Sequence, residues 1–357
     1  MTERLSELAV QIPPITEVRR RLGESVALEV AHNWVTGRVG LVYFVTDPAT
    51  GGRSVFKWVS QGELVAHRDL LPPAPVQVPA VSRWWRSEPD LPAALEMEYI
   101  PDLACPRPCY RFTPDSIPLT DPAWTGPRLE ALFAQLGAMH AEHWDGRGLG
   151  THQQHFERRD PCSDWQSWEE DMRKLYAVQH LPGASEWIDF WLGRERECQR
   201  VLDEAYSYPI TWHWADAKWD HIGCRENGET VVLEYSPHLG PAGSDLYLML
   251  FLPPGRQAAL LNIYLRAARA VISDTVDHIR CLWLGLLRAC YLHGPGQACL
   301  SLRGFADGGS SREDMAAWGK DAAATARVVQ ELEGNPNALP VGDSSTGRTE
   351  TSDGGSP

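Results

Sequence analysis

The chain has 357 residues, of which 43% are hydrophobic and 22% charged, and its formal net charge is −14. This length is sufficient for two subdomains around substantial cores, and the composition is that of an ordinary globular protein. The acidic balance argues against nucleic acid or an anionic membrane as a partner and is compatible with cationic substrates.

Three features bear on the compartment. The N-terminus has no basic segment followed by an apolar run, so it does not resemble a signal peptide. The longest apolar runs, around 258–272 and 281–292, are interrupted by charged residues and are too short to cross a bilayer. The eight cysteines are scattered, which is typical of reduced thiols rather than a disulfide framework. We therefore expect a cytoplasmic protein with no membrane partner.

The N-terminal third is predicted to contain a β-hairpin. After a short helical segment, β-branched and aromatic residues fill 39–46 and 54–60, and a strong turn signal, 47–52, separates them. Lys57 lies in the middle of the second run among apolar neighbours, where a buried charge would need a functional reason. The alternative is a solvent-facing strand residue, because alternation places Phe56 and Trp58 on the opposite face.

The segments after the hairpin carry weaker signals. Glu63 falls on a short predicted helix, residues 71–80 form a proline-rich extended connector, and residues 93–100 form a strand. Cys105 and Cys109 flank Pro-Arg-Pro, a spacing that invites a zinc interpretation. No second Cys/His pair is close in sequence, so a proline-rich loop is favoured.

From Pro127 onward the chain is predicted to be mainly helical. Apolar residues recur at helical spacing from Leu129 to Met139. The following elements are expected in chain order: acidic, tryptophan-rich helices over 160–204, a helix over 246–252 that Pro253 ends, two or three amphipathic helices over 256–303, one further helix over Ser311–Glu333, and a disordered tail over Gly334–Pro357.

The segment from Trp212 to Asp245 concentrates residues capable of phosphoryl-transfer chemistry. Asp216, Asp220 and His221 precede a polar turn, and a short apolar strand then stops at Glu234. Such a loop, turn and strand can hold a cation between two chain segments. Phosphoryl transfer needs one carboxylate to orient the attacking hydroxyl and further ligands for the Mg²⁺ that neutralises the phosphates.

This segment resembles the catalytic core of the aminoglycoside phosphotransferase and choline kinase-like family, relatives of the protein kinases. The family pattern is His-Gly-Asp, an Asn five residues after the Asp, an Asp that opens a triplet after a short hairpin, and an Asp-Leu pair. Asp216 falls on the catalytic Asp, His221 on the Asn and Glu234 on the metal-binding Asp. Asp245 and Leu246 fall on the Asp-Leu pair.

Several identities depart from the family pattern. Trp214 and Ala215 replace His-Gly, His221 replaces Asn, and Glu234 replaces Asp. Histidine ligates Mg²⁺ poorly, because hard cations prefer oxygen, whereas glutamate is a competent oxygen ligand. Lys218, in contrast, favours a working phosphoryl-transfer site. The sequence Asp-x-Lys resembles the catalytic loop of Ser/Thr protein kinases, where the Lys touches the transferred phosphate.

The resemblance covers residues 30–300 and implies an α+β, two-lobed protein kinase-like fold. Residues 1–100 would form a small antiparallel β N-lobe, and residues 101–303 a larger, mainly helical C-lobe with the catalytic and metal-binding loops. Residues 304–333 would form a helical extension, and residues 334–357 the disordered tail.

The resemblance also assigns roles on the nucleotide side. ATP would lie between the lobes, under a loop over 33–40. Lys57 would hold the α- and β-phosphates, and Glu63 would fix Lys57. The cofactor-binding hinge, Glu98, Tyr99 and Ile100, would read the edge of adenine through its backbone.

On the catalytic side, Glu234 and His221, helped by Asp220, would place Mg²⁺. Asp216 would accept or orient the proton of the acceptor hydroxyl, and Lys218 would offset charge on the γ-phosphoryl group. Two further residues have structural roles: Asp245 would brace the catalytic loop, and His140, in a Leu-His-Ala-like motif, would be a buried helix residue.

Three functions remain open at this point. The first is a kinase for a hydroxyl of a small molecule such as an aminoglycoside or another natural product, which the acidic C-lobe favours. The second is a kinase for Ser/Thr of a peptide in lanthipeptide-type biosynthesis, which Asp216-Ala-Lys218 favours. The third is a pseudokinase acting through a protein partner, which the departures at Trp214, His221 and Glu234 favour.

Overall fold

The computed structural model describes residues 13, 15–32, 39–103, 126–156, 162–179, 185–214, 217, 219–233, 237–269, 271–272, 275–306 and 312–335. Several sequence expectations lie outside this part of the chain: the helical segment before residue 13, most of the loop over 33–40, the Cys105–Cys109 loop, and the tail from residue 336. The lobe boundaries at residues 100 and 303 remain predictions.

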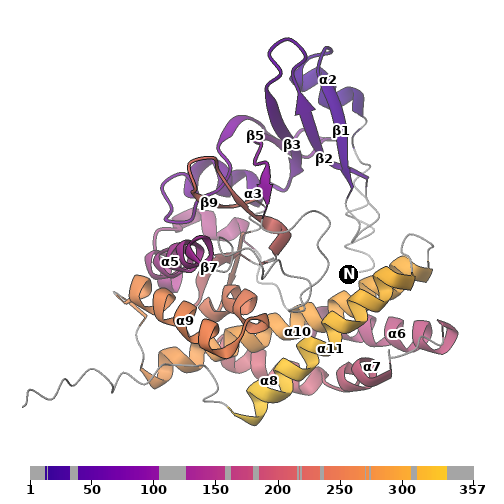
Figure 1. The fold of residues 1–357 in the computed structure, drawn as a ribbon, viewed down its shortest axis with the longest axis vertical. Coiled ribbons are helices and arrows are strands. Elements are labelled where there is room, and N and C mark those ends of the chain that lie inside the picture. Colours follow the sequence, from indigo (N-terminus) through magenta and orange to yellow (C-terminus); the bar gives the residue numbers. More distant parts are fainter. Residues whose placement is uncertain are drawn as a thin grey trace, which may run out of the picture.

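The N-lobe contains a five-stranded antiparallel sheet, drawn at the top of Figure 1. Its strands, in spatial order, are β1 (Ala27–His32), β2 (Val39–Thr46), β3 (Arg53–Val59), β5 (Ala93–Glu98) and β4 (Val81–Trp85). The predicted hairpin is β2–β3. Asp47 closes its turn by accepting hydrogen bonds from the Ala49 N–H and the Thr50 hydroxyl, both at 2.9 Å. The sequence reasoning did not anticipate β4.

Strand alternation gives this sheet two apolar faces. Phe56 and Trp58 point to the outer face, where they pack with Tyr43 and with Val18 of α2 (Ile15–Leu22). Lys57 points to the inner face, and its register partners are Val42 on β2 and Leu95 on β5. Because α2 covers the outer face, the inner face is the one directed at the rest of the chain (Figure 1).

A short helical segment follows β3 on the inner side. Helix α3 (Gln61–Val65) begins at Ser60, whose hydroxyl caps it by accepting a hydrogen bond from the Glu63 N–H at 3.1 Å. The chain then continues as one π-helical turn, η1 (Ala66–Leu70). Such turns are rare and are often found at functional sites. The extended connector predicted over 71–80 follows without a helix or strand.

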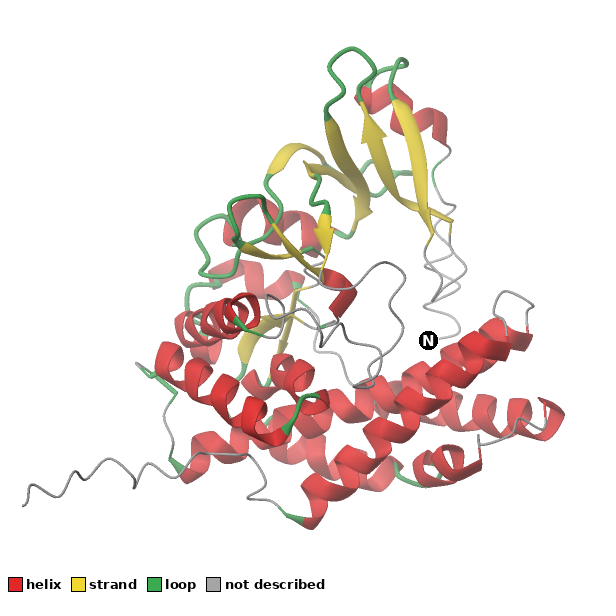
Figure 2. Cartoon of the chain, viewed as in Figure 1, coloured by secondary structure: helices red, strands yellow, loops and turns green. Residues whose placement is uncertain are grey.

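The C-lobe is mainly helical, as the red elements in the lower part of Figure 2 show. Its helices include α5 (Pro127–Glu142), α6 (Cys162–Gln179), α7 (Ser185–Trp191), α8 (Glu195–Ala205), η5 (Ala242–Phe251), α9 (Pro254–Ala268), α10 (Val276–Ala306) and α11 (Arg312–Gly334), with short 3-10 helices at η2 (Trp144–Gly146), η3 (Gly150–His155) and η4 (Trp219–His221). Helix α10 packs against α11, η5, α8 and α6, while α5 packs against α9. Among the described helices, none combines the length and apolar composition needed to span a bilayer.

Two short sheets lie at the junction of the lobes. β6 (Asp102–Leu103), β8 (Ile222–Cys224) and β9 (Thr230–Val232) form one antiparallel sheet, and β7 (Thr211–Trp214) pairs with β10 (Pro237–Gly240) in the other. Since β6 directly follows the hinge, the first sheet ties the hinge to the β8–β9 hairpin.

The helix predicted over 246–252 differs in type from the observed one. It is a 3-10 helix, η5, that starts earlier, at Ala242. Its backbone packs closely on α10: a Cβ on Gly243 would lie 1.8 Å from the Leu282 carbonyl oxygen, and one on Gly285 would lie 2.7 Å from the Gly243 Cα. Only residues without a Cβ fit this crossing. The segment ends before Pro253 as expected, and Pro254 begins α9.

Candidate active site

A cavity lies between the N-lobe sheet and the β8–β9 hairpin. Its lining residues are Val42, Phe44, Val55, Lys57, Pro79, Met97, Glu98, Tyr99, Ile100, Pro101 and Leu233. The walls are thus mostly apolar, the hinge backbone forms one edge, and one lysine lies on the sheet. Such a combination suits a planar apolar ligand that carries a polar edge and an anionic extension.

Lys57, which lines this cavity, forms an ion pair with Glu63. The Lys57 Nζ lies 2.6 Å from the Glu63 Oε1, and the two side chains are 12% and 13% exposed. The pairing expected from the resemblance is therefore present. The Ser60 cap fixes the first turn of α3, so Glu63 is held where it can restrain the ammonium group.

A buried histidine on the same helical segment was missed by the sequence reasoning. His67 is 2% exposed, and its Nδ1 has no hydrogen-bond partner in the described structure. Burial, together with the nearby charge of Lys57, lowers the pKa of His67 from 6.5 to about 3. The ring is therefore neutral at physiological pH. Its position four residues after Glu63 was the available signal, since residues spaced in this way share a helix face.

The hinge residues predicted to bind the cofactor all line the cavity. The Glu98 N–H donates to the Ala80 carbonyl at 2.8 Å, which attaches the hinge to the connector. The Tyr99 ring lies 3.7 Å beneath the Arg53 guanidinium, and its centroid is 5.9 Å from that of Phe44 in an edge-on arrangement. The hydrogen bond to Ala80 and the contacts of the Tyr99 ring with Arg53 and Phe44 therefore hold the hinge in place.

The β8–β9 hairpin brings the two predicted metal-binding segments together. The Leu233 N–H donates to the His221 carbonyl at 2.8 Å, so the residue before β8 lies beside the residue after β9. His221 is 7% exposed, and its ring centroid lies 6.5 Å from that of Trp214. Glu234 immediately follows Leu233 in the sequence.

Four of the predicted site residues have side chains outside the part of the chain that the structure describes. Asp216, Lys218 and Glu234 lie outside the described residues, and the same holds for the side chain of Asp220. Among the side chains that the structure does describe, no three His, Cys, Asp or Glu residues form a group that could hold a metal ion. The predicted Mg²⁺ ligand set therefore stays a prediction.

Asp245 fixes the strand that leads into the predicted catalytic loop. Its fully buried carboxylate accepts hydrogen bonds from the Trp214 N–H at 2.7 Å, the His140 Nε2 at 3.0 Å and the His213 Nδ1 at 3.3 Å. The His140 Nδ1 in turn lies 2.9 Å from the Tyr264 hydroxyl. Asp245 therefore holds the strand before the predicted catalytic loop, whose residues 215, 216 and 218 lie outside the described residues, and the structural role expected of His140 is confirmed.

The charges of this network follow from its contacts. Burial alone would raise the pKa of Asp245, but hydrogen bonds from His140 and His213 hold that pKa below its ordinary value. Burial lowers the pKa of His213, so its ring is neutral and donates through Nδ1. Sequence reasoning missed His213. No local pattern marks it, because its contact with Asp245 joins residues 32 positions apart in the chain.

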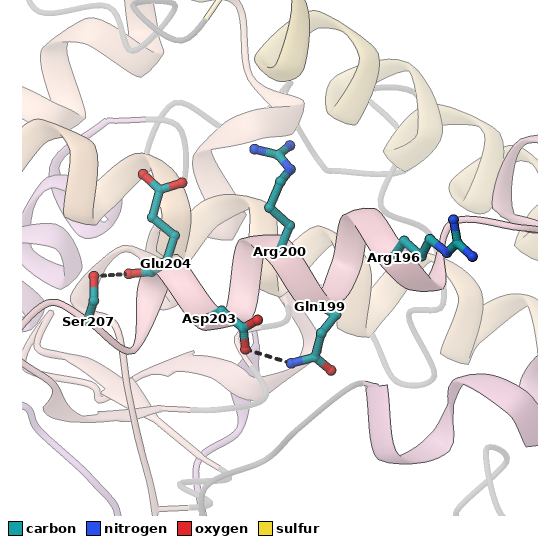
Figure 3. Close-up of a pocket in the computed structure, with 6 residues that line it drawn as sticks. All are labelled: Arg196, Gln199, Arg200, Asp203, Glu204 and Ser207. Carbon is teal, nitrogen blue, oxygen red and sulfur yellow. Dashed lines mark hydrogen bonds between the residues drawn. The ribbon is translucent and has the colours of Figure 1, made fainter.

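A second, shallow hollow lies along α8 (Figure 3). Its lining residues are Arg196, Gln199, Arg200, Asp203, Glu204 and Ser207. Gln199 donates to Asp203 at 2.7 Å, and the Ser207 hydroxyl donates to the Glu204 carbonyl at 2.6 Å. All six residues come from α8 and its end, so this open surface is separate from the cavity between the lobes.

The two-lobed protein kinase-like fold is defined by four features together: the N-lobe sheet, the Lys57–Glu63 pair, the hinge and the helical lobe. Solved structures agree with this fold. The choline kinase of Cryptosporidium parvum Iowa II matches with a TM-score of 0.57 and 12% identity, covering 96% of this chain and 98% of that chain. The expected α+β, kinase-like architecture is therefore confirmed.

Two further structures give the same result. A protein assigned as an aminoglycoside phosphotransferase from Ralstonia eutropha JMP134 matches with a TM-score of 0.53 and 15% identity, covering 87% of this chain and 92% of that chain. The choline kinase of Streptococcus pneumoniae matches with a TM-score of 0.51 and 12% identity, covering 88% and 97%. No protein-family profile and no curated protein sequence matches the chain. At these identities the similarity establishes the fold.

Proposed function

We propose that the protein is an ATP-dependent phosphotransferase that moves the γ-phosphoryl group to a hydroxyl of a small molecule. The observation that supports this most strongly is that Lys57, which lines the cavity between the lobes, is held in an ion pair by Glu63. A largely buried ammonium group held by a carboxylate is pre-organised for an anionic ligand.

The cavity fits a nucleotide in shape and chemistry. Val42, Val55 and Met97 come from the N-lobe sheet and Leu233 from the hairpin, so a base can be enclosed by apolar side chains. The backbone of residues 98–100 supplies the polar edge that such a base would pair with. Lys57 would then contact the α- and β-phosphates.

The catalytic roles follow from the chain positions around the hairpin. Glu234, with Asp220 and His221, would hold Mg²⁺, which neutralises phosphate charge when bound. Carboxylates suit this cation, whereas the His221 imidazole is a poor ligand for it. Asp216 would orient the acceptor hydroxyl and take up its proton, and Lys218 would offset charge on the transferred group.

The acceptor we propose is a cationic small molecule, such as an aminoglycoside, another basic natural product or a choline-like alcohol. Two of the matching proteins are named choline kinases and one is assigned as an aminoglycoside phosphotransferase. Choline and aminoglycosides are both cationic, and the net charge of −14 favours their approach.

A pseudokinase with a protein partner is the second candidate. Trp214 is completely buried in the main core at the position where the resemblance expects a histidine, and His221 stands at the position of a metal-binding Asn. A peptide kinase rests on Asp216 and Lys218 alone, which lie outside the described residues.

A transfer assay tests the proposal. The protein is incubated with γ-labelled ATP and Mg²⁺ beside a panel containing choline, several aminoglycosides, a macrolide and a Ser/Thr peptide. We expect label on a cationic small molecule with the wild type and none with Asp216→Asn. Label on the peptide alone would establish the peptide kinase instead, and nucleotide binding without any transfer would favour the pseudokinase.

A further inference from the structure

Arg225 joins three segments that meet at the edge of the cavity. It lies at the end of β8, in the turn of the β8–β9 hairpin. Its Nε donates to both carboxylate oxygens of Glu98 at 3.0 Å, and its Nη2 donates to Glu98 at 2.9 Å and to the Val78 carbonyl at 2.8 Å. Its Nη1 bonds to Glu229 of the same turn. One guanidinium group thus connects the hinge, the connector and the hairpin.

The charges of this cluster are held in place by burial and pairing. The Arg225 side chain is 19% exposed and that of Glu98 is 32% exposed. Burial would raise the pKa of Glu98, but the hydrogen bond from Arg225 and one from the Ala80 N–H keep that pKa below its ordinary value. Glu98 is therefore ionised, and its carboxylate is held by Arg225 of the hairpin turn and by the Ala80 N–H of the connector.

The backbone contacts in the same place are close. Asp102 and Leu103 pair with Cys224 and Gly223 in the β6–β8 ladder. A Cβ on Gly223 would lie 2.7 Å from the Ile100 Cγ2, so the hairpin backbone packs directly on the hinge. The hinge and Leu233, which belong to different walls of the cavity, are consequently parts of one joined unit.

We propose that Arg225 is a positioning residue for the nucleotide base. By tying Glu98 to the hairpin turn, it holds the backbone of residues 98–100 at a fixed distance from Leu233, so that one planar base fits between them. The proposal rests on the proposed function, because it names a residue that prepares the same site. The planar fork of Arg serves four acceptors at once, which the single ammonium group of Lys cannot reproduce.

Arg256 provides a matched control. Its side chain is 23% exposed, its Nη1 donates to Glu130 at 2.8 Å, and its Nη2 donates to the Gly126 carbonyl at 3.0 Å. It therefore has a similar exposure and the same kinds of partner as Arg225, but it joins α9 to the start of α5. If each arginine only stabilised the fold through its ion pair, substituting either one would change nucleotide affinity to a similar extent.

The test is a titration of wild type, Arg225→Met, Arg225→Lys and Arg256→Met with adenosine and with ATP·Mg²⁺. Because adenosine lacks phosphates, an effect at the base changes both affinities by the same factor. We expect Arg225→Met to weaken both about tenfold, equivalent to about 1.4 kcal/mol, and Arg225→Lys to recover only part of the loss. Arg256→Met should bind as the wild type does.

Amide hydrogen exchange gives a second readout that needs no nucleotide. Arg225→Met should speed exchange in residues 98–103 and 222–232 by more than Arg256→Met does. Wild-type affinity in Arg225→Met, or exchange that changes equally in both variants, would overturn the proposal. If the wild type binds no nucleotide, the proposed function fails, and the positioning role fails with it even if exchange confirms the link between hinge and hairpin.

Discussion

The buried, neutral state of His67 predicts a specific dependence of stability on pH. In the folded protein its pKa is lowered to about 3, whereas in the unfolded chain it is close to 6.5. Between these values the unfolded state binds one more proton, so the free energy of unfolding rises with pH over this window and falls as pH drops below 6.5. One proton corresponds to about 1.4 kcal/mol per pH unit.

His67→Leu removes this contribution. Between pH 7 and pH 5 the wild type should lose about 2 kcal/mol more of its unfolding free energy than the variant does. The measurement is urea unfolding at four pH values from 7 to 5, with His152→Leu, at a partly exposed position, as a control for the loss of a histidine. A difference between His67→Leu and wild type that stays constant within about 0.5 kcal/mol across these pH values would refute the reasoning.

Three further outcomes are expected. Asp245→Asn should cost about 3 kcal/mol or more at pH 7 in urea unfolding, because it weakens a buried charged acceptor for the Trp214 N–H and two imidazoles. The difference from wild type should shrink as pH falls below the ordinary range of an aspartate, because the unfolded chain then takes up a proton that the folded carboxylate, with its lowered pKa, does not. Gly285→Ala should destabilise by about 2 kcal/mol or more, whereas Gly255→Ala, where a Cβ would meet nothing within 4 Å, should be neutral or stabilising by up to about 1 kcal/mol. Asp216→Asn should lower the transfer rate about 100-fold or more while leaving the affinity for ATP unchanged.

Lys57 shows what a strand pattern can and cannot predict. The alternation of apolar residues correctly placed Phe56 and Trp58 on the face opposite Lys57. It could not say which face the rest of the chain would cover, because that depends on contacts distant in sequence. The pairing with Glu63 came from the resemblance, and the structure shows it at 2.6 Å.

The Asp245 network likewise contains one role that the sequence predicted and one contact that it did not. The spacing of Asp245 after the predicted catalytic loop matched the resemblance closely enough to predict a bracing role, and the structure shows its contact with Trp214. His213 was not predicted, because its contact with Asp245 is made by the pairing of β7 with β10 and by the packing of η5 against β7. Arg225 was likewise only part of a polar turn in the sequence, since its partners Glu98 and Val78 lie more than a hundred residues away.

Helix types were harder to predict than helix positions. The segment around 246–252 has helical spacing in the sequence, but the observed η5 is a 3-10 helix. A glycine contact with α10, through Gly243 and Gly285, determines how closely this segment approaches its neighbour. Such close approach depends on both partners, so one segment alone does not reveal it.

The most direct test of the proposed function is a titration of the purified protein with ATP, with and without Mg²⁺, beside Lys57→Ala and Glu63→Gln. We predict binding that Mg²⁺ strengthens, and a loss of affinity of about tenfold or more in Lys57→Ala with a smaller loss in Glu63→Gln. Binding that is unaffected by Lys57→Ala, or no binding in the wild type, would contradict the assignment of the cavity between the lobes as a nucleotide site.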